Sequence, residues 1–534
     1  MKRTSTPMSL PLSLAILLVF DSGAALAAQG PSSSANPYLQ GVAPGVAFTS
    51  ILTTGDKVGG YAMAGLPDGL GAYDNFNGTF TLLMNHEMSA GVGAMRSHGA
   101  MGAFVSQWVI NKSTLQVLSG SDLIQRAYAW NSVTQSSSLT ASAMSFANFC
   151  SADLPPTTAY AYTGGLGTNA RIFMGGEEGG TGRAFAHVAT GPNQGSSYEL
   201  GKFNTSSNGS GGNATGGWEN LLANPYAQAS TVVIGNNDGG TGVMRHSLAV
   251  YVGTKTNSGS DADRAGLTNG TTQFVQIPGV ANEINDPTSR STAIANGVRF
   301  GLSSNSSTAF SRPEDGAWNP SNPREYYFVT TDQLDRTELT GGTQKGGTRL
   351  WRLTFDDLAN VAAGGKIDIL LDASTLPGGV GVDKPNMFDN MTVNEDGSLS
   401  LQEDPGGSEH NAKVWHFDPV SKQLVLIAKF DPALFGDVVA GSFVAGSRTQ
   451  NEESSGVIDI TSLLGRNDGQ RYHLMVAQDH SAATDLGLPA DLVQGGQLLL
   501  MSQSVTPIPE PATYALMLAG LGALLLVTRR RRIA

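Results

Sequence analysis

Acidic side chains stand at the ends of several short β-rich runs in this sequence of 534 residues. The groups are Asn85-His86-Glu87, Glu177-Glu178, Asp238, Asp332, Glu403-Asp404 and Gln478-Asp479-His480. Carboxylate oxygens are the ligands that Ca²⁺ prefers, and the ion takes about six to eight of them. If the fold brings these strand ends to one face, the sequence predicts a cation-binding pocket there.

Two further residue types bear on chemistry. Cys150 is the single cysteine, which excludes an internal disulfide and a four-cysteine zinc site but leaves one thiolate available to a metal. Arg312 is the second, because a guanidinium can pair with a carboxylate or contact phosphate oxygens in a bidentate manner. The sequence has no G-x-x-x-x-G-K-[ST] or G-x-S-x-G motif, and His86-Glu87 does not continue as H-E-x-x-H, which disfavours P-loop enzymes, α/β-hydrolases and zinc proteases.

The composition is acidic and poor in charge. There are 32 basic and 44 acidic side chains, and only 14% of residues are charged, with 67 glycines. Removing both termini beyond residues 28–509 leaves 26 basic and 42 acidic side chains, a net charge of −16. This balance argues against a nucleic-acid partner, since phosphate backbones select clustered Lys and Arg.

The elements that must position these residues are short strands. Runs rich in β-branched and aromatic residues recur between Gly, Asn, Asp and Pro, for example at Thr231–Ile234, Glu325–Thr330 and Lys413–Phe417. Asp396-Gly397 predicts a hairpin turn. More than a dozen such runs without βαβ alternation predict an all-β fold, and the acidic strand ends favour a β-propeller of about six blades with long inter-blade loops at 132–151, 190–217 and 254–270.

The N-terminus is typical of a secretory signal peptide. Lys2 and Arg3 precede an apolar run, and Ala25-Leu26-Ala27 forms a cleavage site. We therefore assign residues 1–27 to a signal peptide and residues 28–504 to the propeller body, which places the body outside the cytoplasm.

The C-terminus, residues 505–534, predicts a single transmembrane helix. Pro509-Glu510-Pro511 is followed by an uncharged stretch and then by Arg529–Arg532, which stays in the cytoplasm under the positive-inside rule. This order resembles the PEP-CTERM sorting signal of Gram-negative, exopolysaccharide-producing bacteria. The resemblance implies recognition by an exosortase and release from the periplasmic side of the inner membrane to the cell surface or biofilm matrix. The alternative is a permanent inner-membrane anchor.

A second resemblance covers much of residues 80–480. It rests on Leu83-Met-Asn-His-Glu87, Asn148-Phe-Cys150, Gly175-Gly-Glu-Glu178, Arg312-Pro-Glu-Asp315 with Ala317-Trp-Asn-Pro320 and Tyr326-Tyr-Phe-Val-Thr330, and Asp389-Asn-Met-Thr-Val-Asn-Glu-Asp-Gly397 with Gln402-Glu-Asp404. Together these segments resemble the PhoX-type alkaline phosphatases, which are exported propellers with a calcium and iron centre. The resemblance implies calcium, and also iron, as cofactors and phosphoric esters as substrates.

The resemblance also implies roles for particular residues. Arg312 and Glu314 are expected at the catalytic position, and the expected metal ligands are Glu87, Cys150, Glu177, Glu178, Asp238, Glu314, Glu403 and Asp404. The sequence departs from the family after Cys150, at Lys255 and at Glu403-Asp404-Pro-Gly406.

Two functions remain open from the sequence. One is a metal-dependent phosphomonoesterase sorted to the cell surface. The other is a non-catalytic, calcium-stabilised propeller of the surface or exopolysaccharide matrix, in which the carboxylates are surface and turn residues and Cys150 is a small buried hydrophobe.

Overall fold

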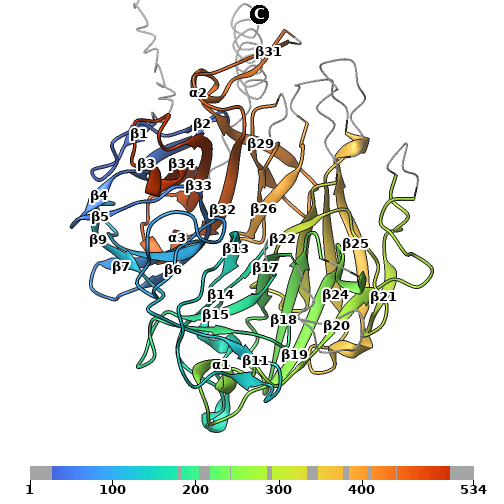
Figure 1. Ribbon diagram of the computed structural model, residues 1–534. Coiled ribbons are helices and arrows are strands. Elements are labelled where there is room, and N and C mark those ends of the chain that lie inside the picture. The colour runs from blue at the N-terminus through green and yellow to red at the C-terminus, as the bar shows by residue number, and fades with distance from the viewer. Residues whose placement is uncertain are drawn as a thin grey trace, which may run out of the picture.

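The computed structural model describes residues 27–178, 182–203, 217–240, 242–285, 291–332, 347–376, 384–406, 410–440 and 442–504. Within these ranges the chain is all-β and propeller-like, as expected from the sequence (Figure 1). The α-helices are α1 (Asp261–Arg264), α2 (Pro432–Phe435) and α3 (Thr461–Leu464), and no helix in the described ranges could span a membrane. The predicted signal peptide and sorting helix lie outside the described residues, apart from residue 27.

Four separate sheets form four blades. The strands of the first two blades are β6 (Pro67–Asp74), β7 (Thr79–His86), β8 (Phe104–Asn111) and β9 (Val117–Asp122), then β13 (Phe149–Asp153), β14 (Ile172–Glu177), β15 (Ala184–Val188) and β16 (Ser196–Glu199) with β10 (Arg126–Tyr128) at the edge. The strands of the other two are β26 (Phe388–Val393), β27 (Leu399–Glu403), β28 (Lys413–Phe417) and β29 (Leu424–Phe430) with β2 (Leu39–Gly41), then β32 (Glu452–Asp459), β33 (Gln470–Ala482), β34 (Gln494–Ser504) and β3 (Val46–Thr53) with β1 (Ala28–Gln29).

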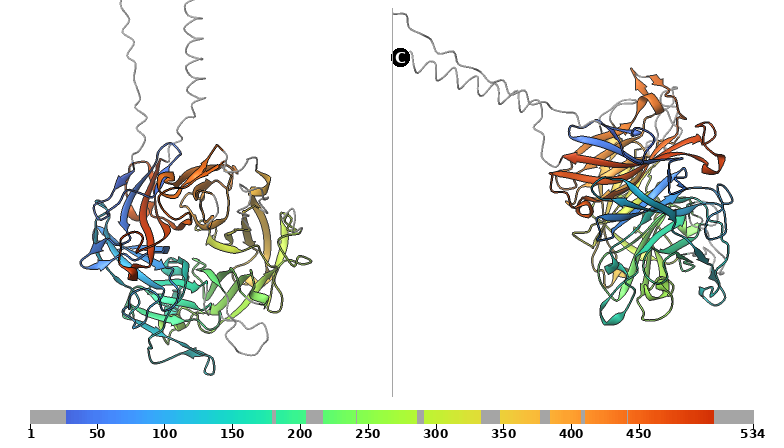
Figure 2. Two further views of the ribbon diagram at one scale, coloured as in Figure 1. Left: turned by 45° about the horizontal axis from the view of Figure 1, so that its top comes forward. Right: turned by 90° about the vertical axis from the view of Figure 1, so that its left-hand side faces the viewer.

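A nine-stranded sheet completes the arrangement. It contains two antiparallel four-stranded meanders joined edge to edge through β21 (Val298–Ser303). Their strands are β17 (Trp218–Ala223), β18 (Ser230–Asn237), β19 (Leu248–Thr254) and β20 (Thr271–Gln276), and β22 (Pro313–Trp318), β23 (Glu325–Thr330), β24 (Arg349–Phe355) and β25 (Gly365–Asp372). The blades lie in a ring (Figure 2). Strands β6, β13, β17, β22, β26 and β32, one edge strand from each unit, contact one another in succession around the axis and are therefore innermost.

The ring is closed by both ends of the body. The N-terminal strand β3 pairs antiparallel with β34, so the last blade combines the first and last parts of the described chain. A second N-terminal strand, β2, extends the preceding blade by pairing with β29. Closure of this kind leaves only short outer edges of the sheets unpaired.

The apolar core lies between neighbouring blades. One cluster joins Met174 and Ala186 of one blade to Trp218, Val233 and Tyr251 of the next, and all five residues are buried. The outer strands therefore follow the apolar patterns that the sequence shows. The innermost strands, which border the axis, carry more polar residues and glycine.

All three stretches expected to be loops contain regular structure. The segment 190–217 contains β16 (Ser196–Glu199), which pairs with β15. The segment 254–270 contains α1, which begins after Ser260 with a capping box that Asp263 completes. The segment 132–151 contains the start of β13 at Phe149. The hairpin expected at Asp396-Gly397 is confirmed between β26 and β27, where Gly397 has φ 84°.

A buried ion-pair network joins β24 to its neighbours. Arg349 is fully buried, and its Nη1 lies 2.8 Å from Glu283 Oε1 while its Nε lies 3.1 Å from Asp372 Oδ2. Asp332, one of the acidic residues at a strand end, lies 3.6 Å from the same Nη1. This carboxylate therefore has a structural partner.

We expect Arg349→Met to lower the free energy of unfolding by about 3–5 kcal/mol, because it leaves buried carboxylates without their counter-charge. The matched control is Arg352→Met on the same strand, where Arg352 is partly exposed and pairs with Asp368 at 3.0 Å. This change should cost about 0–1 kcal/mol. Urea denaturation measures both values, and equal losses would contradict the structural role assigned to Arg349.

Candidate functional site

An acidic pocket of about 190 Å³ lies where the innermost strands begin. The residues that line it are Asp68, Glu87, Cys150, Glu178, Glu219, Arg312, Glu314, Asp389, Asp404, Asn451, Glu453 and His480. Eight of these carry carboxyl groups, against one arginine and one histidine. We call this set the axial acidic pocket.

Six of the lining residues occupy the same position in six different strands. Each is the second residue of an innermost strand: Asp68 in β6, Cys150 in β13, Glu219 in β17, Glu314 in β22, Asp389 in β26 and Glu453 in β32. In the first five of these strands the pairing register with the next strand shifts across that residue. Such a bulge leaves the residue out of the regular ladder and redirects its side chain, here toward the axis.

A second set comes from the strands next to the innermost ones. Glu87 follows β7, Glu178 follows β14 and Asp404 follows β27. Since these strands run antiparallel to their innermost neighbours, the end of one and the start of the other meet at the same edge. Both sets therefore reach one pocket.

The side chains are close enough to hold cations. Three groups, each with its ligand atoms within 4.8 Å of one another, are Asp68–Glu87–Cys150, Cys150–Glu178–Glu219 and Glu219–Glu314–Asp389. Neighbouring groups share Cys150 or Glu219. The arrangement is thus a row of adjacent positions rather than one isolated site.

A glycine allows two of the strands that carry these ligands to lie close together. A Cβ placed on Gly176 would lie only 2.3 Å from the Cβ of Trp218 in the neighbouring blade. Only glycine allows β14 and β17 to lie this close, which brings Glu178 and Glu219 into one group. This explains the second glycine of Gly175-Gly-Glu-Glu178.

The structure brings together most of the residues expected from the sequence. Glu87, Cys150, Glu178, Glu314 and Asp404 all line the axial acidic pocket, and so does Arg312. The Sγ–H of Cys150 donates to Glu178 Oε2 at 3.0 Å.

Glu177 and Glu403 do not line the pocket. Each is the last residue of its strand, so its side chain points to the face opposite that of the residue that follows it. Glu177 Oε2 accepts a hydrogen bond from Arg183 Nε at 2.9 Å, and Glu403 Oε1 accepts one from Trp415 Nε1 at 2.7 Å. Both carboxylates are fully buried with these protein donors.

Asp238 does not line the pocket but contacts Arg312, which does. Its Oδ2 lies 3.0 Å from Arg312 Nε, and its Oδ1 lies 3.1 Å from His246 Nδ1. On its other side Arg312 Nη2 lies 3.0 Å from Glu314 Oε1. The guanidinium is held between two carboxylates at the pocket wall, and Arg312 itself has a left-handed φ of 59°.

The sequence prediction missed Asp68, Glu219, Asp389, Glu453, Asn451 and the role of His480 in the pocket. The signal that could have found the first four is an acidic residue at the start of a strand, directly opposite the acidic end of the next strand. These starts were hidden because Pro67-Asp68-Gly69 and similar segments read as turns.

Burial and mutual repulsion raise the pKa of several carboxyl groups here. Burial, with the charge of Glu87, raises the pKa of Glu178 to about 8. Burial and neighbouring carboxylates also raise the pKa of Asp68, Glu219 and Asp389. Burial opposes protonation of His480, but the carboxylate of Glu453, 3.8 Å from its Nε2, raises its pKa to about 9, which favours the cationic imidazole at neutral pH.

The donor set fits divalent cations. Arg312 and His480 cannot balance eight carboxylates, and Asp68 is almost fully buried with no partner for its Oδ1 in the described part of the chain. Burial of unpaired carboxylates is costly unless cations neutralise them. Oxygen-rich ligands suit Ca²⁺, and a thiolate from Cys150 beside carboxylates would suit a transition metal such as iron.

Comparisons with known proteins identify the C-terminal segment. Residues 507–532 match the PEP-CTERM protein-sorting motif. The motif indicates an exported protein of a Gram-negative bacterium that is sorted at the membrane, and it implies recognition by an exosortase-type processing enzyme. No curated protein sequence matches the chain.

Solved structures are similar only at a distance. They include Kuenenia stuttgartiensis hydrazine synthase (9% identity, 75% of this chain and 80% of that chain, TM-score 0.29) and the WD40 domain of SCAP from fission yeast (10% identity, 86% and 74%, TM-score 0.25). A mutant of the Synechocystis apocarotenoid oxygenase shares 9% identity over 80% of this chain and 89% of that chain, with a TM-score of 0.31. Similarities this low carry no argument about the site.

We expect the metal-free protein to lose stability as pH rises from about 4.5 to about 8. The pKa of Glu178 lies near 8 in the folded state and near its ordinary value of 4.5 in the unfolded state, so the folded state binds more protons throughout this window. Calcium should reverse the loss, by about 2.7 kcal/mol per site at about 100 times its Kd. Thermal unfolding with a chelator and with Ca²⁺ measures both effects. A calcium effect equally large at pH 5 and pH 8 would contradict the charge repulsion described here.

Proposed function

We propose that the body is a six-bladed propeller of the PhoX-like class and that its axial acidic pocket is the centre of a metal-dependent phosphoric ester hydrolase. The observation that carries this proposal is the row of three ligand groups beside Arg312. An acidic pocket alone would hold cations. A guanidinium at its wall adds a group suited to the substrate's phosphate.

The residues of the pocket have three roles in this proposal: some hold the cations, some complete the negative wall, and Arg312 binds the phosphate. Asp68, Glu87, Cys150, Glu178, Glu219, Glu314 and Asp389 would hold the cations, with Asp404 and Glu453 completing the negative wall. Bound cations would neutralise these groups, attract phosphoryl oxygens and lower the pKa of an attacking water. Iron, which the resemblance implies beside calcium, would use Cys150.

Arg312 binds and orients the phosphate in this proposal. Asp238 and Glu314 hold its guanidinium through Nε and Nη2, which fixes the plane of the group. The side chain remains partly exposed, so it can meet a ligand at the pocket. The cationic His480 is a second donor to phosphoryl or leaving-group oxygens.

The first test compares two adjacent residues. In the full-length protein, Glu178→Gln should lower the metal content and reduce hydrolysis of p-nitrophenyl phosphate by about 100-fold. Glu177→Gln should keep the metal content and activity of the folded protein but lower its stability, because Glu177 is paired with Arg183. Elemental analysis, a phosphatase assay with added Ca²⁺ and thermal unfolding measure the three quantities. Activity unchanged in Glu178→Gln would reject the site.

The non-catalytic calcium-binding propeller remains the second candidate. The observation in its favour is that the guanidinium of Arg312 is already paired with the carboxylates of Asp238 and Glu314, as in a structural ion pair. Lys255 does not decide between the two, because its Nζ donates to Gln228 O and Ser230 O at 2.8 Å and does not line the pocket. Calcium bound without any hydrolysis would favour this second candidate.

The sorting motif bears on where the protein acts, whichever of the two functions it has. We infer that an exosortase removes the C-terminal segment and that the body then reaches the cell surface or the exopolysaccharide matrix. Replacing Pro509, Glu510 and Pro511 by alanine should leave a full-length protein in the membrane fraction, whereas the natural chain should appear shortened outside it. Immunoblots of cell fractions show the difference. Equal release of both proteins would contradict this inference.

A further inference from the structure

A second and larger cavity lies on the same six innermost strands. Its volume is about 660 Å³, within the range of roughly 300–1,000 Å³ that is usual for small-molecule sites. The innermost strands contribute their second residue to the axial acidic pocket and later residues to this cavity, for example Cys150 and then Ser151 and Asp153 in β13. The two spaces therefore follow one another along the axis.

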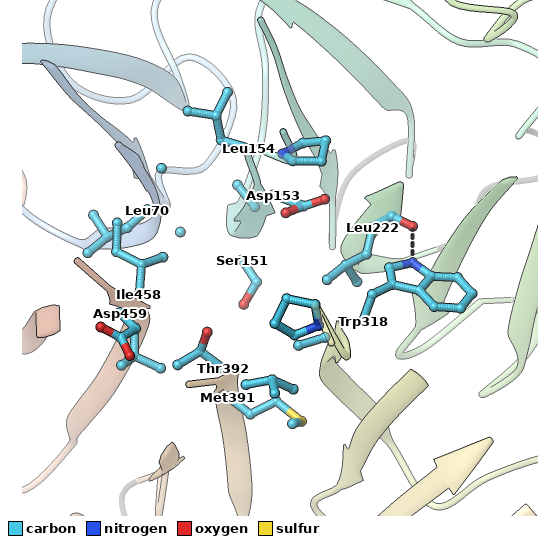
Figure 3. Close-up of a pocket in the computed structure, with 18 of the residues that line it drawn as sticks. Leu70, Ser151, Asp153, Leu154, Leu222, Trp318, Met391, Thr392, Ile458 and Asp459 are labelled. Atoms are coloured by element: carbon cyan, nitrogen blue, oxygen red, sulfur yellow. Dashed lines mark hydrogen bonds between the residues drawn. The ribbon is translucent and has the colours of Figure 1, made fainter. Parts of the chain in front are cut away.

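The cavity combines apolar walls with negative charge. Leu70, Leu154, Leu222, Met391 and Ile458 line it from five different segments (Figure 3). Four carboxylates also line it, and no lysine, arginine or histidine is among the described residues that do. An anionic ligand is thereby disfavoured, and a cationic ligand is favoured.

Three of the four carboxylates already accept hydrogen bonds from several groups of the protein itself. Asp315 accepts hydrogen bonds from Asn220, Gly316 and Met391. Asp459 accepts from Thr461 and Glu395, and Glu395 in turn accepts from Ser462. These groups shape the wall and leave little capacity for a ligand.

Asp153 differs from the other three. Its Oδ2 accepts a hydrogen bond from Ala223 N at 3.2 Å, and its Oδ1 has no hydrogen-bond partner within the described ranges. Burial, with the charge of Asp315, raises the pKa of this carboxyl group to about 8. A positively charged ligand would favour its ionised form.

Asn390 provides an independent observation. It is 1% exposed and lines the cavity, and its Nδ2 donates to Ser151 Oγ while its Oδ1 has no partner in the described chain. Ser151 and Asp153 both belong to β13 and both line the cavity (Figure 3). The hydrogen bond to Ser151 thus connects Asn390 to the strand that carries Asp153, and both side chains with an unpartnered acceptor line this cavity.

We propose that this cavity binds a small organic ammonium ion, an amine with a compact apolar body. The ammonium group donates to Asp153 and Asn390, and the apolar body packs against Leu70, Leu222 and Ile458. A bare divalent cation fits less well, because one free carboxylate and one amide oxygen are far fewer ligands than the roughly six to eight oxygens that Ca²⁺ takes. The proposal does not depend on the phosphatase assignment.

The test is a calorimetric titration of the full-length protein with phenethylamine, and with 2-phenylethanol as the neutral molecule of the same shape. Saturating Ca²⁺ keeps the amine from the axial acidic pocket, and a pH of about 8.5 ionises Asp153 while the amine stays protonated. We expect the alcohol to bind at least about tenfold more weakly than the amine. Asp153→Asn, which keeps the shape of the side chain, should weaken amine binding by at least about tenfold and leave alcohol binding unchanged.

The control variant is Asp485→Asn, which removes one carboxylate from the exposed surface and should leave amine binding unchanged. Circular dichroism and the thermal midpoint establish that each variant is folded. The proposal is overturned by no amine binding up to about 10 mM, by equal binding of the alcohol, or by amine binding that survives Asp153→Asn. Glu178→Gln should retain amine binding, which separates this result from failure of the phosphatase assignment.

Discussion

Repulsion among the carboxylates at the axis is the constraint on which the rest of the structure depends. Eight of them share a pocket of about 190 Å³ with one arginine and one histidine. The strands that carry them come from every part of the ring, so unbalanced negative charge at the axis repels all the blades from one another. Two features oppose this repulsion: the apolar clusters between blades, and any cations that the ligand groups hold.

Much of the fold could be predicted because the outer strands obey simple patterns. Segments such as Thr231–Ile234 and Arg349–Phe355 are rich in β-branched and aromatic residues, since they pack between blades. The innermost strands do not follow this rule. Segments such as Pro67-Asp68-Gly69 border the axis instead of the core, so their composition resembles that of a turn.

The residues of the axial acidic pocket show the same difference between strands that the sequence predicts well and strands that it does not. Glu87, Glu178 and Asp404 could be found because each follows a recognisable strand. Asp68, Glu219 and Asp389 could not, since each lies at a bulge at the start of its strand, where the regular pattern of the strand is interrupted. The prediction also included Glu177 and Glu403, which do not line the pocket. Strand alternation separates each of them from the residue that follows only when the last residue of the strand is known.

The way the ring closes has a consequence for the sorting of the protein. The ladder between β3 and β34 joins the start of the body to its end, and its last described hydrogen bond runs from Ser504 N to Gly45 O. The matched sorting motif begins at residue 507, beyond that bond. Proteolysis inside the motif therefore leaves β3 and β34 on the same fragment, so the closing blade keeps both of the strands that join the start of the body to its end.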